Sequence, residues 1–534
     1  MTAASGTQPF SPDKRGSVRG KPPMELAARR ASPSGREYLV ALLAALVFYL
    51  VSMAPGPLWQ DSGLAQVRVL QGDLHGNFGL ALSHPLYYVL AIGFQYLPLG
   101  ESAFKTNLVS AVFGALTVAN AFLLLRVVTR RRTPAVVGAL SLAVAHTFWQ
   151  HCALAEVYTV STALLVTELL CLRQYARHGN SRWLVLLFLT NGVGVSNHVL
   201  AVLSLACYGI MLLWLLLRRK VAVNTVILSG LAWLLGAGLY LGMILGEIMS
   251  GAGVGETARS ALFGSHYERY VLNLVPGGRL LVNSLQYLAL NFPTPVALLA
   301  LTGLLALPTM RPRLFARVLG GLLVVHLLWA VRYDVVDQYT FFIPSVVLIA
   351  LLIGVGAERF LQRRRARWRG VLIVGALLPA IVYIPLPQIA RAAGLKTGVS
   401  RKVPYRNEYK YFLHPWKTGY RGAEQFADEL CEALPPGAVL VADGTTVRPI
   451  HYLQLTHRWR EDIRVWPSLD PAQPSWPATE EELRPQLDAG LVYVVAPQKR
   501  YCPQWLLDGY DFTTGGIVHR VRPRGDAASR PAAP

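Results

Sequence analysis

Residues 39–53 read LVALLAALVFYLVSM, an apolar run with no charged side chain, and residues 57–66 then read PLWQDSGLAQ. A helix needs about 20 mainly apolar residues to cross a bilayer, and further runs of this kind recur towards residue 390. The chain of 534 residues is 53% hydrophobic and only 15% charged. Soluble proteins carry roughly 25% charged residues, so the sequence predicts a polytopic α-helical membrane protein.

The apolar runs predict about eleven spans, with a shorter piece at 84–97 that is expected to be a juxtamembrane or re-entrant helix. Basic clusters such as RVVTRRR at 126–132 separate the runs and fall on the side of the basic N-terminal segment, so the positive-inside rule places the N-terminus in the cytoplasm. The expected spans are 37–55, 105–125, 134–152, 157–172, 183–197, 199–217, 222–247, 285–308, 316–331, 338–357 and 370–387.

Composition divides the chain into four parts. Strand-like pieces (AVLVA at 438–442 and LVYVVA at 491–496) alternate with helix-like pieces after the last span, which predicts a small α/β domain on the extracytoplasmic face. The polar N-terminal part reads as a disordered cytoplasmic tail before a signal-anchor span. The expected parts are 1–36, a disordered basic tail; 37–390, the transmembrane domain with its first outer loop at 56–104; 391–520, the α/β domain; and 521–534, a disordered tail.

The net charge of +21 would suggest a nucleic-acid partner in a soluble protein, but the basic residues cluster between apolar runs, so none is expected. The five cysteines show no CxxC or Cys/His metal spacing, although Cys431 and Cys502 could pair outside the cell. No phosphate-cradling glycine loop or nucleotide fold is evident.

With this topology, unusual polar residues gather at the outer face. Each has a plain alternative: Asp61 could be a helix cap, His84 a helix-starting residue, and Glu156 and His198 solvated turn residues. Trp59 is of the kind found at membrane interfaces, and Glu168 is expected to snorkel towards the cytoplasmic edge near Arg173. The outer-face residues are Asp61, His84, Glu156, Asn197, His198, Arg332, Asp334 and Asp337.

A carboxylate held partly out of water can act as a general base on an acceptor hydroxyl, an effect worth roughly 10²–10⁴ in rate. A nearby arginine can bind and stabilise a leaving phosphate. A lipid phosphate as the leaving group would explain why such a site lies beside a membrane.

WQDSG after the first span, SHPLYYVL, KTNLVSAVFGALTVANAFLLLRVV, FWQHCALAEVYTVSTALL and GVSNHV resemble, in order and spacing, a family long of unknown function that includes a vertebrate protein O-mannosyltransferase. That family belongs to the GT-C glycosyltransferases, polytopic enzymes that use polyprenyl-phosphate sugars and an essential aspartate in the first outer loop. The resemblance is best over about residues 36–215.

The resemblance implies a GT-C-like fold and a glycosyltransferase in which Asp61 is the catalytic base. The enzyme would move mannose or another hexose, with inversion, from a polyprenyl-phosphate donor to a hydroxyl on a protein or envelope glycan. Arg332 is expected at the donor phosphate, and no metal or cofactor is expected because a cationic side chain can meet that phosphate. The residues expected to shape the substrate pocket are His84, Glu156, Tyr158, Asn197, His198 and Asp337.

Two other functions stay open. A transporter or lipid flippase is disfavoured because the charges lie at one face and no internal repeat is found. A non-catalytic envelope-assembly scaffold would keep its function after Asp61→Asn. The Ala/Arg/Gly/Pro-rich tails favour a bacterial plasma (inner) membrane, where the expected partners are membrane lipids, the lipid-linked donor and the acceptor.

Overall fold

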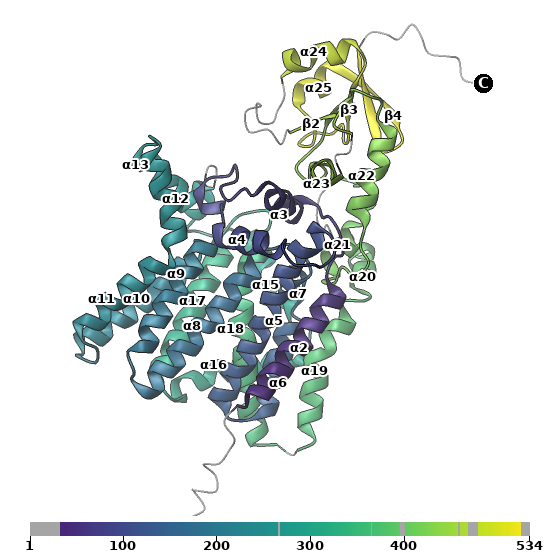
Figure 1. The fold of residues 1–534 in the computed structure, drawn as a ribbon. Helices are drawn as coiled ribbons and strands as arrows, with labels where there is room; N and C mark the ends of the chain where they lie inside the picture. The colour runs from purple at the N-terminus through teal and green to yellow at the C-terminus, as the bar shows by residue number, and fades with distance from the viewer. Residues whose placement is uncertain are drawn as a thin grey trace, which may run out of the picture.

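The computed structural model describes residues 33–264, 267–364, 366–395, 401–457, 460–467 and 479–524. Figure 1 shows a bundle of long helices with a small α/β domain at one end, beside the short helices α3 and α4. This arrangement confirms the prediction of a mostly helical polytopic protein with a small C-terminal sheet domain.

The first half of the helical part contains α2 (Gly35–Ser52), α3 (Gln60–Gln71), η1 (Leu80–Leu82), α4 (Pro85–Phe94), α5 (Ser102–Thr129), α6 (Arg132–Ala143), α7 (His146–Cys152), α8 (Tyr158–His178), α9 (Arg182–Asn197) and α10 (Ala201–Leu217). The second half contains α11 (Val223–Gly236), α12 (Gly238–Met249), α13 (Val254–Phe263), α14 (Glu268–Val271), α15 (Gly278–Asn291), η2 (Pro295–Leu298), α16 (Leu299–Ala306), η3 (Leu307–Thr309), α17 (Arg313–Arg332), η4 (Gln338–Phe342), α18 (Ile343–Gln362), α19 (Trp368–Val382) and α20 (Leu386–Ala392).

Fewer helices meet the length and apolarity of a membrane span than the eleven expected. Among the described residues, four qualify alone, and seven qualify if each bent helix pair counts as one span. Four expected spans do not qualify: the run at 134–152 is broken between α6 and α7, α8 with its 21 residues is not apolar enough, and α9 and α10 have only 16 and 17 residues. The three bent pairs turn by 67°, 113° and 53°.

The first outer loop is fixed to the bundle by a buried glutamine. The side chain of Gln66 on α3 accepts from the Leu58 amide (2.9 Å) and donates to Asn107 of α5 (3.0 Å). Gly72 ends α3 in the left-handed region with φ of 66°, which glycine adopts at little cost. Because Gln66 and Asn107 are both fully buried, α3 is held rigidly at the end of the bundle.

The C-terminal domain is a mixed five-stranded sheet in the order β2-β1-β3-β5-β4, with β1 parallel to β2 and β3. Its strands are β1 (Val439–Val441), β2 (Arg464–Trp466), β3 (Val492–Val494), β4 (Tyr510–Gly515) and β5 (Val518–Pro523). Its helices are α21 (Glu408–Leu413), α22 (Gly422–Ala433), α23 (Val447–His457), α24 (Glu480–Asp488) and α25 (Gln504–Gly509). Cys431 and Cys502 are buried and unpaired.

Candidate functional site

A cavity of about 410 Å³ lies at the end of the bundle, next to α3 and α4. Six of the eight residues expected at the catalytic and substrate sites line it, although the chain separates them widely. Its polar and aromatic wall is formed by Asp61, Arg68, His84, Tyr88, Glu156, Tyr158, His198, Tyr267, Tyr333, Asp337, Tyr339 and Thr340. Its apolar wall includes Leu64, Phe78, Leu82, Leu200, Leu203, Leu262, Phe263 and Trp329.

Asp61 is the second residue of α3, and its side chain is exposed to this cavity. The N-cap of α3 is Trp59 without a side-chain cap bond, so the interpretation of Asp61 as the helix cap is wrong. Burial raises the pKa of Asp61, whereas the Arg448 guanidinium acts to lower it. Asp61 is therefore an acid whose charge depends on the groups placed around it.

Two further carboxyl groups share the cavity. Glu156 Oε1 accepts a hydrogen bond from Ser62 Oγ at 2.8 Å, while Asp337 lies just before η4. Burial and the nearby Asp61 raise the pKa of Glu156 to about 8 and that of Asp337 to about 6. At neutral pH Glu156 therefore keeps its proton, because like charges in one cavity cannot all ionise freely.

The two predicted histidines form an aromatic cluster with Tyr158, in which neighbouring rings are tilted by about 40° to each other. The His84 and His198 ring centroids lie 4.6 Å apart, and Tyr158 lies 5.4 Å from His198. His84 Nδ1 is 3.1 Å from the Asn197 carbonyl oxygen, and its backbone has φ of 51°, a conformation that L-residues rarely adopt. Such backbone conformations are concentrated at functional sites, and here one orients a ring on the cavity wall.

Arg68 is the cavity cation that the sequence analysis missed. Its guanidinium lies 3.7 Å from the centroid of the Tyr88 ring, its Nε is 3.2 Å from Asp73 Oδ2, and its Nη2 donates to the Ser83 carbonyl at 3.1 Å. A signal was present, because Arg68 is the single arginine of residues 56–104 and the positive-inside rule disfavours it there.

The remaining two expected residues lie outside the cavity wall. Asn197 is fully buried and donates to the Val157 carbonyl (3.0 Å) and to Ser161 (2.8 Å), which ties α9 to the start of α8. The guanidinium of Arg332 donates to the carbonyl oxygens of Val271 and Asn273 and lies over Trp329. Arg68, not Arg332, therefore presents its charge to the cavity.

The cavity combines an acid that can act as a base, a fixed cation and a broad apolar wall. This combination suits a polar reaction on a substrate with an apolar tail. Within the described ranges no group of three or more His, Cys, Asp or Glu side chains is arranged to hold a metal ion. The absence of a metal requirement stays a prediction.

Residues 83–222 match the family described as the Protein O-mannosyl-transferase TMEM260 N-terminal domain. No protein of curated function matches the chain. The structure of ArnT from Cupriavidus metallidurans bound to undecaprenyl phosphate is similar, with 14% identity and a TM-score of 0.54 over 93% of this chain and 100% of ArnT. The apo state of ArnT has 15% identity and a TM-score of 0.52, over 84% of this chain and 94% of ArnT.

At such low identity the likeness to ArnT shows the fold alone. The resemblance predicted from the sequence motifs is confirmed: the chain has a GT-C-like fold, and its residues 83–222 match the family of TMEM260 N-terminal domains of protein O-mannosyl-transferases.

Proposed function

We propose that this protein is a membrane glycosyltransferase that moves mannose or another hexose from a polyprenyl-phosphate donor to a hydroxyl group of a protein or envelope glycan. The observation that carries the proposal is the cavity in which Asp61 lies beside a cation and an apolar wall. The fold shared with ArnT, which was solved with undecaprenyl phosphate bound, supports a lipid-phosphate donor.

In the proposed reaction, Asp61 takes the proton of the acceptor hydroxyl while the hydroxyl oxygen attacks the anomeric carbon of the sugar. The bond between that carbon and the phosphate oxygen breaks, and the lipid phosphate leaves with the electron pair. Attack from the side opposite the phosphate inverts the anomeric centre. Proton abstraction by a positioned carboxylate contributes roughly 10²–10⁴ in rate.

Arg68 is the better candidate for the leaving phosphate, in place of Arg332, because it lines the cavity. Its contacts with Asp73, Ser83 and Tyr88 hold the guanidinium in place before substrate arrives, so little reorganisation is needed. The aromatic cluster of His84, His198 and Tyr158 would form the face on which the sugar packs.

The proposal includes the orientation of the protein in the membrane. The cavity and the C-terminal domain face the outside of a bacterial plasma membrane, and the end of the bundle where α2 starts faces the cytoplasm. Arginines gather at that opposite end around a second cavity, which fits the positive-inside rule. The shorter apolar helices would cross together with their neighbours and bring the number of spans towards eleven.

The test is sugar transfer by the purified protein in detergent, with a panel of radiolabelled polyprenyl-phosphate sugars and a membrane-protein extract as acceptor. Asp61→Asn is expected to lose transfer by about 10²–10⁴ with normal expression, since the amide cannot take the proton. The matched control is Asp334→Asn, because Asp334 pairs with Arg279 and is not on the cavity wall. Equal transfer by wild type and Asp61→Asn would overturn the proposal.

A further inference from the structure

The C-terminal domain packs on the first outer loop and is not merely tethered to the bundle. Trp59 is 1% exposed, packs on Phe426 of α22 with ring centroids 5.2 Å apart, and donates from Nε1 to the Tyr420 hydroxyl at 2.6 Å. The Ala103 amide at the start of α5 donates to the Tyr452 hydroxyl at 2.9 Å. The interpretation of Trp59 as a membrane-interface residue is therefore wrong, because it belongs to the core of the C-terminal domain.

The edge of the sheet that meets α3 is the carboxyl end of its parallel strands. The loop after β1 leads into α23, and its Thr445 carbonyl accepts from the amide of Gln60, the residue before Asp61, at 3.4 Å. In open α/β sheets, functional groups concentrate at this edge. Here the carboxyl edge of the sheet lies against α3, the helix that carries Asp61, and Figure 1 shows α23 beside α3.

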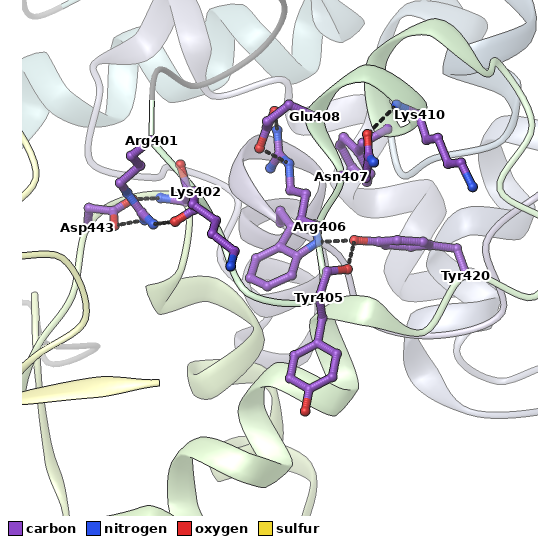
Figure 2. Close-up of polar contacts among 12 residues, drawn as sticks. Arg401, Lys402, Tyr405, Arg406, Asn407, Glu408, Lys410, Tyr420 and Asp443 are labelled. Carbon is purple, nitrogen blue, oxygen red and sulfur yellow. Dashed lines mark hydrogen bonds and ion pairs between the residues drawn. The ribbon is translucent and has the colours of Figure 1, made fainter. Parts of the chain in front are cut away.

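A buried ion pair fixes the loop that starts α23. Figure 2 shows Arg401 pointing at Asp443, with which it forms an ion pair in which both side chains are almost fully buried. The same carboxylate accepts from the Thr445 amide at 2.9 Å and from the Thr446 hydroxyl at 3.0 Å. The first turn of α23 therefore has a defined position relative to α3.

Arg448 is the second residue of α23 and lies where this helix approaches α3. A Cβ atom at Gly63 would lie 2.8 Å from the Cβ of Arg448, so α3 and α23 approach as closely as they do because residue 63 has no side chain. The guanidinium interacts electrostatically with Asp61 and with Tyr88. The guanidinium of Arg448 forms no hydrogen bond or ion pair with the residues that the structure describes, so its charge acts on Asp61 without another partner.

We propose that the C-terminal domain completes the catalytic site by supplying Arg448, a positioning residue whose positive charge keeps the Asp61 carboxylate ionised as the base. This inference rests on the proposed function for the role of Asp61 as base, whereas the electrostatic coupling of Arg448 to Asp61 can be tested without any assay of transfer.

Three carboxyl groups share one cavity, so the charges around each carboxyl group determine which of the three is ionised. Asp61 raises the pKa of Glu156 and of Asp337, and Arg448 is the cation that opposes the rise in the pKa of Asp61 itself. The titratable and charged groups that share the cavity with Asp61, or act on it electrostatically, are Arg68 on its own helix, Tyr88 of α4 and the α4 N-cap residue His84, Glu156, Tyr158, His198, Tyr267, Tyr333, Asp337, Tyr339 and Arg448.

The first experiment measures the protonation of Asp61 directly. A hydrophobic carbodiimide reacts with protonated carboxyl groups, so the labelling of Asp61 in the full-length protein is followed by mass spectrometry between pH 4 and pH 9. Arg448→Gln is expected to move the midpoint of labelling upward by about one pH unit or more, because removal of a nearby positive charge favours the neutral acid. Arg448→Lys keeps the charge and is expected to stay close to wild type.

Arg522→Gln serves as the matched control, because Arg522 is an exposed arginine of the same domain on β5. Asp61→Asn identifies the labelled peptide. An unchanged midpoint in Arg448→Gln, or an equal shift in Arg522→Gln, would overturn the proposed role of Arg448. Both results are independent of which sugar or acceptor is used, and of whether transfer is detected at all.

The second experiment measures transfer as a function of pH. For Arg448→Gln the rising acid limb of the rate is expected to move to higher pH, with about tenfold lower transfer at neutral pH and recovery above pH 8. A loss that is equal at every pH would overturn the positioning role. If the wild type transfers no sugar while the labelling midpoint still depends on Arg448, the proposed function fails and the electrostatic coupling of Arg448 to Asp61 stands.

Discussion

One glutamate lies just before α8 and another lies in the middle of this helix, and the two differ in how many of their carboxyl oxygens accept hydrogen bonds. Glu168, inside α8, is 2% exposed, and its two oxygens accept from Asn191 at 3.2 Å and from Tyr208 at 2.9 Å. Glu156, just before α8, lines the cavity and accepts from Ser62 through Oε1. A buried acid with both oxygens engaged links helices, whereas an acid with an oxygen facing a cavity can meet a substrate.

This comparison corrects the expectation for Glu168. The carboxyl group does not snorkel towards Arg173 but binds side chains of α9 and α10, because those helices place an amide and a hydroxyl at the same depth. The hydropathy of one segment does not show which side chains of other helices will form hydrogen bonds with a polar residue of that segment. Substitution of each glutamate in turn tests whether the two residues have these different roles.

The largest effect is expected from Glu168→Leu. The substitution leaves the Asn191 amide and the Tyr208 hydroxyl without their acceptor, which costs about 2–6 kcal/mol of stability at roughly 1–3 kcal/mol for each buried group. Transfer per folded molecule is expected to stay near wild type. Thermal unfolding in detergent, monitored by tryptophan fluorescence, measures the loss. Glu168→Gln, which keeps one acceptor oxygen, should cost less, and an equal cost for both variants would contradict the hydrogen-bond account.

Most of the bundle and much of the site could be predicted from the sequence. Residues that follow apolar runs at the same membrane face must meet at one end of a bundle, which is why Asp61, Glu156 and Asp337 could be grouped before any coordinates. The helix-like pieces at 422–434 and 446–455 likewise correspond to α22 and α23. Strands β2, β4 and β5 were not predicted, because β2 has only three residues and the other two strands carry mostly half-buried or exposed residues.

The cations were harder to predict than the acids. Arg332 follows an apolar run at the same membrane face as Asp61, but its guanidinium donates hydrogen bonds to two backbone carbonyls. Arg448 lies hundreds of residues after Asp61, in a stretch, TTVRPIHYL, that carries no motif. Its place depends on how the small domain packs on Trp59 and Gly63, which is a property of the tertiary structure alone.

A smaller effect is expected from Glu156→Leu, and it should appear in transfer instead of stability. The apolar side chain removes the acceptor of the Ser62 hydroxyl and a polar group from the cavity wall, so transfer is expected to fall by about tenfold, or 1.4 kcal/mol. Rates at saturating donor for Glu156→Leu and Glu156→Gln measure it. Because Glu156 is protonated at neutral pH, Glu156→Gln should retain most of the activity, and equal losses in the two variants would contradict this view.

The smallest effect is the pH dependence of stability that Glu156 contributes. Its pKa is about 8 in the folded protein, above that of an ordinary glutamate in the unfolded chain, so between about pH 5 and pH 8 the folded state holds the proton that the unfolded state has released. The free energy of unfolding contributed by this group therefore falls as pH rises through that window. Glu156→Gln lacks this titration. The melting temperature of the variant minus that of the wild type should therefore rise by about 1–3 °C between pH 5 and pH 8. A difference that stays constant over this range would show that Glu156 ionises normally and that the cavity does not hold its proton.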